Sequence, residues 1–253
     1  MNNDYIEIQD SYDRGGYTHS TTSTGVTTFS GIMSRVYLWM TAALLLTAGT
    51  AYLTTASPAL LQLIYGNAWA VWVLIIAELG LVFSISGGIN RMSPTTATTL
   101  FLVYSVVNGL TMSCIFFVYS LGTIYQAFAA AALTFGAMSL YGYTTKKDLS
   151  GLGSYLFMGL IGLIIASFIN ILWGNSLMDV IITYFGVFLF VGLTAYDTQK
   201  IKELSAAVEA GTQMGYADAA APRRIAIIGA LQLYLDFINL FLYLLRLFGR
   251  GRD

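Results

Sequence analysis

Two aspartates stand inside apolar segments of membrane length, and they are the residues of this sequence best placed to do chemistry. Asp197 ends an apolar stretch that begins near Leu177, and Asp236 lies in the middle of "LYLDFINLFL". A carboxylate in the hydrocarbon of a bilayer is costly, so an intramembrane aspartate is by default a candidate functional residue. Two carboxyl groups within hydrogen-bonding distance share a proton and titrate as one unit. If the fold brings these two side chains together, they form a proton-sensitive site.

The composition predicts that a membrane surrounds these aspartates. The chain has 253 residues, of which 57% are hydrophobic and 10% are charged, whereas soluble domains carry about 25% charged residues. The net charge of −1 gives no basis for a nucleic-acid partner. One cysteine, Cys114, and one histidine, His19, are too few for a cysteine-cluster or histidine-cluster metal site. The lipid bilayer is therefore the first expected partner, and no resident cofactor is expected.

A transmembrane helix requires about 20 mostly apolar residues. The sequence contains seven such runs and predicts an all-α integral membrane protein; the runs cover 34–55, 68–88, 97–119, 123–144, 153–173, 177–198 and 225–248. Residues 1–30 are polar and rich in Ser, Thr and Gly, which is typical of a disordered tail. Residues 31–253 form the predicted seven-helix membrane domain. Within it, the polar stretch 199–224 is predicted as a cytoplasmic loop with room for a short surface helix.

Lysine and arginine in the short links predict the direction of the spans, because these residues favour the cytoplasmic side. With a cytoplasmic N-terminus, nine of the twelve basic residues lie inside. The other three, Arg246, Arg250 and Arg252, follow the last span. That span either crosses fully or enters and returns with the C-terminus inside. Crossing is favoured, since about 24 residues at about 1.5 Å each exceed a core of about 30 Å. Asp197 and Asp236 are then expected to meet in the cytoplasmic half of the bundle.

Other residues in the spans indicate helix contacts and further charge. Ala132 and Gly136 are small and four apart, which predicts close approach of a neighbouring helix. Glu78 is a third ionisable residue within a span, and Arg91 stands near the end of that same span.

Several stretches, in order between about residues 30 and 248, resemble the Bax inhibitor (transmembrane Bax inhibitor motif) family in its bacterial form. They are "NRMSPTTATTLFLVYSVVNGLTMSCIFFVY", "YGYTTKKDLSGLG", "AYDTQKIK" and "LQLYLDFINLFLYLLRLFG". The resemblance implies a seven-helix bundle whose last helix is central and surrounded by the other six. It also implies a pH-dependent calcium leak in a bacterial inner or plasma membrane, with calcium as the permeant ion.

The resemblance further implies roles for individual residues. Asp197 and Asp236 match the family's proton-sensing aspartates on the sixth and seventh helices, where they would also contact calcium transiently. Arg91 matches an arginine that pairs with the sixth-helix aspartate in the closed state. Glu78 matches a second-helix glutamate by position, as part of the ion pathway. The long 199–224 stretch departs from the shorter family versions, so no gating contact is carried over to it.

Two other function classes use the same features. Intramembrane aspartyl proteases carry one aspartate on each of two adjacent helices, the first in a Tyr-Asp pair such as Tyr196–Asp197. The second site here reads "LYLD" where those enzymes have Gly-x-Gly-Asp, and no Pro-Ala-Leu follows it, so no enzymatic activity is expected. Some bacterial relatives are described as regulators of a membrane-bound ATP-dependent protease. A non-conducting regulator, with the N-terminal tail as its partner-binding element, therefore stays open as an alternative.

Overall fold

The structure, a computed structural model, describes residues 29–214, 218 and 220–250, and every regular element within them is a helix. Seven of these helices are long and apolar enough to cross a membrane, which confirms the predicted all-α, seven-span fold. The long helices are α2 (Phe29–Thr55), α4 (Ala68–Gly88), α5 (Pro94–Met112), α7 (Leu121–Thr144), α8 (Ser150–Trp173), α9 (Ser176–Gln213) and α10 (Ala221–Gly249), and the short ones are α3 (Pro58–Tyr65) and α6 (Ile115–Val118).

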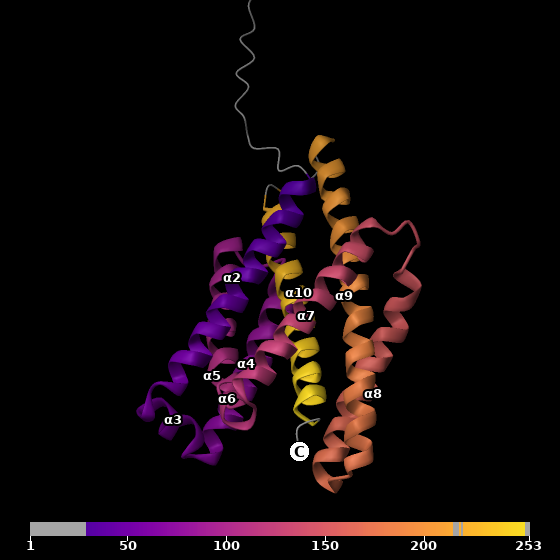
Figure 1. The fold of residues 1–253 in the computed structure, drawn as a ribbon. Coiled ribbons are helices and arrows are strands. Elements are labelled where there is room, and N and C mark those ends of the chain that lie inside the picture. Colours follow the sequence, from indigo (N-terminus) through magenta and orange to yellow (C-terminus); the bar gives the residue numbers. More distant parts are fainter. Residues whose placement is uncertain (1–28, 215–217, 219, 251–253) are drawn as a thin grey trace, which may run out of the picture.

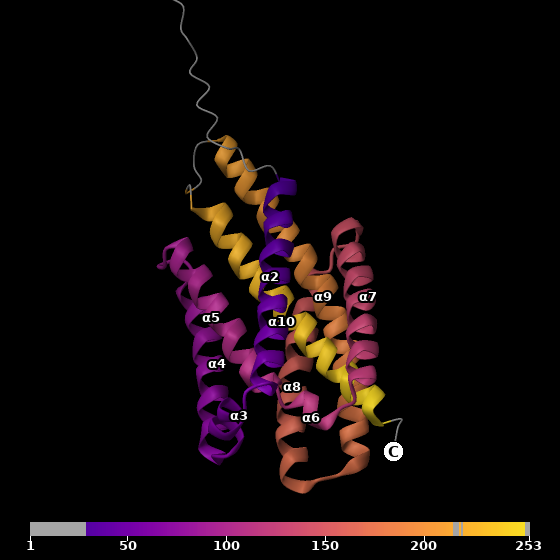
Figure 2. The same cartoon turned by 60° about the vertical axis from the view of Figure 1, so that its left-hand side comes forward.

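The long helices run up and down in one bundle (Figures 1 and 2). The amino-terminal end of the bundle is the end at which α2 begins; it also holds the α4–α5 turn and the start of α10. Serine caps fix where two helices begin: Ser93 Oγ accepts the N–H of Thr96 at 3.1 Å before α5, and Ser120 Oγ accepts the N–H of Thr123 at 3.2 Å before α7. Each cap satisfies a backbone donor that the first turn leaves free.

The last helix is the most deeply buried of the seven spans. In its most apolar stretch of 18 residues, 67% is buried by protein, against 6% for the corresponding stretch of α8 and 11% for that of α4. It packs against α9, α2, α7 and α5, whereas α4 packs mainly on α5, and α8 on α9. The expectation that all six other helices surround α10 is therefore not confirmed. Its 29 residues run unbroken from one end of the bundle to the other, and at about 1.5 Å each they exceed the bilayer core.

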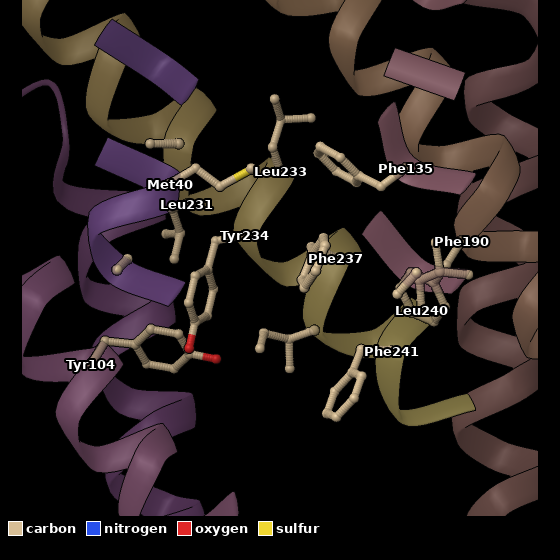
Figure 3. Close-up of a cluster of buried hydrophobic side chains, with 14 of the residues drawn as sticks. Met40, Tyr104, Phe135, Phe190, Leu231, Leu233, Tyr234, Phe237, Leu240 and Phe241 are labelled. Atoms are coloured by element: carbon tan, nitrogen blue, oxygen red, sulfur yellow. The ribbon is translucent and has the colours of Figure 1, made fainter. Parts of the chain in front are cut away.

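Aromatic side chains of α10 meet rings from two other helices (Figure 3). Tyr234 points towards Tyr104 of α5, and the two rings meet edge to face at 5.7 Å between centroids. Phe237, three residues further along α10, contacts a different helix, and its ring meets that of Phe135 of α7 at 5.5 Å. Such edge-to-face pairs are a favoured arrangement of aromatic rings. These pairs join α10 to α5 and to α7, and α10 also packs against α2 and α9.

The ninth helix is longer than its apolar run. It remains helical to Gln213, so the predicted 199–224 loop is in fact helical over more than half of its length. The reason is local: "KIKELSAAVEA" is rich in Lys, Glu and Ala, which have high helix propensity. Ile201 and Ser205 also stay buried, so the extension is held by packing as well. The predicted disordered tail and His19 lie outside the described residues, apart from Phe29 and Ser30, which belong to α2.

The predicted contact face of α7 is wrong. Ala132 and Gly136 are exposed to the bundle's surroundings, and a Cβ added at Gly136 would meet nothing within 4 Å. The close approach occurs at Gly142, where an added Cβ would lie 2.2 Å from the carbonyl oxygen of Ala195 in α9. Six residues of α-helix rotate the side chain by about 240°, so Gly136 and Gly142 do not share a face.

Candidate functional site

The antiparallel packing of α9 and α10 brings Asp197 and Asp236 together. Their carboxyl groups lie close enough to interact directly as a pair. Both are buried, with 9% of Asp197 and 4% of Asp236 exposed. Among the described residues, Oδ2 of Asp236 has no hydrogen-bond partner, although the carboxyl group interacts electrostatically with that of Asp197. A buried carboxyl oxygen left in this way is costly unless it is neutral or can meet a cation.

A chain of hydroxyl groups fixes the helix turn that carries Asp197. The neighbouring Thr198 places its Oγ1 3.1 Å from Oγ of Ser139 in α7. Ser139 in turn shares a short hydrogen bond with the hydroxyl of Tyr37 in α2. Because these partners come from α2 and α7, three helices determine the orientation of this turn of α9.

Gln199 ties the same turn to the link between α7 and α8. Its Oε1 accepts the N–H of Leu149 at 2.8 Å, and its Nε2 donates to the carbonyl oxygen of Lys147 at 2.8 Å. Both bonds lie at the amino-terminal end of the bundle, next to Asp197. The motif "YDTQK" therefore combines one carboxyl group with two anchoring side chains.

Lys200 is the cation that interacts electrostatically with Asp197. The two residues are three apart in α9, a spacing that places side chains on one helix face. Nζ of Lys200 also lies 5.9 Å from the centre of the Tyr196 ring. This role of Lys200 was not predicted above, although the i, i+3 spacing of aspartate and lysine in the sequence could have indicated it.

Arg91 stands apart from the aspartate pair in this structure. It lies in the turn after α4, where its side chain is exposed and its N–H donates to the carbonyl oxygen of Gly88 at 2.9 Å. Across the described residues, the ion pairs are Arg224–Asp218, Arg246–Asp179 and Arg250–Asp179. The structure therefore does not join Arg91 to Asp197.

Glu78 belongs to a second polar cluster. Its carboxyl group interacts with Asn108 and Thr111 of α5, and its Oε1 is buried without a hydrogen-bond partner among the described residues. Asn108 Oδ1 accepts the hydroxyl of Tyr234 at 3.1 Å, and that hydroxyl is 2.6 Å from Thr47 Oγ1.

The two polar clusters lie on different faces of α10. Tyr234 and Asp236 are two residues apart, which is about 200° around a helix. The Glu78 cluster thus faces α2 and α5, and the aspartate pair faces α9. Tyr234, which was not among the predicted site residues, joins the Glu78 cluster to α10.

Two interacting carboxyl groups are chemically able to share, gain and lose a proton. Carboxylate oxygens are the ligands that calcium prefers, but a calcium site uses six to eight oxygens. Within the part of the chain that the structure describes, no group of three or more His, Cys, Asp or Glu side chains could hold a metal ion together. Asp197 and Asp236 alone do not make up such a calcium site.

Known proteins with similar sequences support the membrane assignment. The profile of the family described as "inhibitor of apoptosis-promoting Bax1" matches residues 30–253. The inner membrane protein YbhL of Escherichia coli K12 is 49% identical over 220 residues, covering 87% of this chain and 92% of YbhL. A protein of Borreliella burgdorferi is 42% identical over 221 residues (87% and 92%), and a membrane protein of Streptococcus pyogenes is 43% identical over 176 residues (70% and 72%). With its seven membrane-spanning helices, the chain belongs to the Bax inhibitor family of integral membrane proteins.

Proposed function

We propose that this protein is a pH-sensitive calcium leak channel gated by the Asp197–Asp236 pair. The observation that carries the proposal is the direct interaction of two buried carboxyl groups from neighbouring transmembrane helices. Ionisable residues in such positions are expensive to keep and mark ion or proton pathways. Membership of the Bax inhibitor family is consistent with this function.

A shared proton supplies the gate. Two carboxylates in contact do not both ionise readily, so the pair holds one proton between α9 and α10. Gain or loss of that proton changes the net charge at the α9–α10 contact and the hydrogen bond across it. The hydrogen bond between α9 and α10 and the attraction of the pair for calcium then change together. The pH therefore controls how readily calcium passes.

Glu78 is the second carboxyl group of the proposed ion pathway. Its buried Oε1 has no hydrogen-bond partner in the described part of the chain, so it is free to act as an oxygen ligand. Together the Glu78 cluster and the aspartate pair supply carboxyl groups on two faces of α10. Because neither site alone is a full calcium cage, an ion that enters can also leave.

The proposal also includes a closed state in which Arg91 pairs with Asp197, and a direction for the spans. Arg91 pairs with Asp197 only if the α4–α5 turn moves towards α9, because in this structure its side chain is exposed. The N-terminus lies in the cytoplasm, as the basic residues of the links predict.

Calcium flux into liposomes tests this function. The purified full chain is reconstituted around a calcium-sensitive dye, and flux is followed between about pH 5 and 8, where a coupled carboxyl pair should titrate. We expect flux above that of empty liposomes, with a steep dependence on pH. Asp148→Asn is the matched control, because Asp148 is an exposed carboxylate in the α7–α8 link and should leave the pH profile unchanged.

Absence of flux at every pH would refute the channel. Cleavage of a transmembrane peptide by the same preparation would then favour the aspartyl protease. Neither flux nor cleavage, together with co-purification of a membrane-bound protease, would favour the regulator.

A further inference from the structure

A cavity of about 460 Å³ opens at the amino-terminal end of the bundle, between α2, α5 and α10. Arg35 and Trp39 of α2 line it, with Arg223 of α10 and the first turns of α5 around Thr95. We call it the arginine cavity. It belongs to neither polar cluster of the proposed channel, because none of its lining residues contributes to the aspartate pair or to the Glu78 cluster.

Two positive charges line the arginine cavity, and no carboxylate among the described residues lines it with them. Arg35 and Arg223 are both exposed, and within the described residues neither forms an ion pair. The next residue, Arg224, differs: it pairs with Asp218 at 2.7 Å and donates to the carbonyl oxygen of Met92 at 3.4 Å. The fold thus brings to one cavity two guanidinium groups from distant parts of the chain, neither of which has an ion-pair partner in the described part of the structure.

The chemistry of this cavity matches a phosphate group. A guanidinium group presents a planar fork of N–H donors that bonds phosphate oxygens in pairs. The start of α5 adds partial positive charge, because the first backbone N–H groups of a helix point outwards. The threonines contribute less, since Thr98 and Thr99 already donate their hydroxyls to the carbonyl oxygens of Pro94 and Thr95. The arginines are therefore the anchors.

The rest of the cavity is apolar and lies at the level where the spans begin. Ala226 and Ile227 line it and are buried, and Trp39 is partly buried. The spans of α2 and α10 start at Gly31 and Ala221, within two turns of the two arginines. Tryptophan and arginine at this depth are typical of the membrane interface. A ligand that fits has an anionic head for the arginines and apolar parts for this surface.

We propose that the arginine cavity binds the phosphate headgroup of an anionic phospholipid. The phosphodiester bonds to Arg35 and Arg223, and the glycerol and upper acyl chains contact Trp39, Ala226 and Ile227. Such a lipid lies against α2, α5 and α10 at once, so it joins the first and last spans at the membrane surface. Free phosphate shares the headgroup's charge but lacks the apolar part.

Native mass spectrometry of the full chain in detergent tests the lipid site. The protein is titrated with phosphatidylglycerol and, separately, with zwitterionic phosphatidylcholine. We expect tighter binding of phosphatidylglycerol, and a loss of about tenfold or more in Arg35→Gln/Arg223→Gln, because two charge-assisted bonds disappear. The phosphatidylglycerol affinity of Arg35→Lys/Arg223→Lys should lie between that of the wild type and that of the glutamine variant, because lysine keeps the positive charge but lacks the planar fork of N–H donors.

The matched control is Lys146→Gln/Lys147→Gln. It removes two exposed charges from the same end of the bundle, in the α7–α8 link and away from the cavity. Its lipid affinity should equal that of the wild type, and the unfolding temperature of each variant checks that it folds. Equal phosphatidylglycerol binding by Arg35→Gln/Arg223→Gln and wild type, or an equal loss in the lysine control, would overturn the proposal. Displacement of the lipid by millimolar inorganic phosphate, again dependent on both arginines, would assign the cavity to free phosphate and overturn the lipid.

Discussion

Asp197 and Asp236 share one contact but have different surroundings. Asp197 lies next to Lys200 and the Thr198–Ser139 hydroxyl chain, whereas Asp236 lies within the most buried span. Among the described residues, Asp197 is thus the polar group that interacts with the carboxyl group of Asp236.

A shared proton makes the two aspartates act as one unit. Asp197→Asn and Asp236→Asn should each remove most of the pH dependence of calcium flux, because either change removes the like-charge repulsion. The double variant should then stay within about twofold of either single variant, as expected for coupled neighbours. The measurement is flux against pH for the four proteins. Two independent, additive shifts would show that the carboxyl groups titrate separately.

The cation next to the pair differs from the one that the family resemblance implies. Lys200→Gln should move the steep part of the flux profile to higher pH, because loss of a nearby positive charge disfavours the ionised pair.

Arg91→Ala should raise the resting leak if the closed state includes an Arg91–Asp197 contact. Flux profiles of the two variants separate these roles. An unchanged leak in Arg91→Ala would leave it as a surface residue of the α4–α5 turn.

At the scale of the helices, α7 and α9 approach each other closely at a position that the Ala132–Gly136 pattern did not predict. At Gly142 the backbone of α7 meets the carbonyl oxygen of Ala195, two residues before Asp197. This contact sits beside the Ser139–Thr198 bond, so both set the distance between the two helices.

Gly142→Ala should therefore destabilise the bundle. A methyl group placed 2.2 Å from a backbone oxygen cannot be accommodated without moving a helix, and such overpacking costs about 1–3 kcal/mol. Gly136→Ala, in the same helix with nothing within 4 Å, is the control and should unfold like the wild type. Thermal unfolding in detergent gives the comparison. Equal stability of the two variants would mean that α7 and α9 have room to separate.

At the scale of the whole molecule, an odd number of crossings places the two ends of the membrane domain on opposite sides. The structure has seven spans, with α2 beginning at one end of the bundle and α10 ending at the other. The excess of basic residues at the amino-terminal end predicts that this end faces the cytoplasm.

Single-cysteine variants test this direction in a Cys114→Ala background. Asp253→Cys should react with a membrane-impermeant maleimide added to intact cells, and Ser11→Cys should react only after the membrane is opened. The reverse pattern would invert the orientation. Reaction of both residues from outside would require the last span to turn back within the membrane, against the unbroken course of α10.

The sequence by itself determined the number of spans and the residues of interest. Seven apolar runs are sufficient evidence for seven spans, because the thickness of a bilayer sets the length of a crossing helix. Asp197, Asp236 and Glu78 were identifiable because a carboxyl group in hydrocarbon is costly wherever the helix packs. The family resemblance rested on local motifs in the same way.

Only the tertiary structure decided which of these residues meet. Hydropathy does not report the rotation of a helix about its axis, so the sequence could not place Gly142 rather than Gly136 against α9, or Glu78 with Asn108 rather than with the aspartates. It also could not show that Arg35 and Arg223 line one cavity, since the packing of α2 against α10 creates that contact. The thickness of the membrane sets the length of a span, so a local run of residues is enough to predict it. Which side of a helix faces which neighbour depends on the shapes of all the helices packed around it.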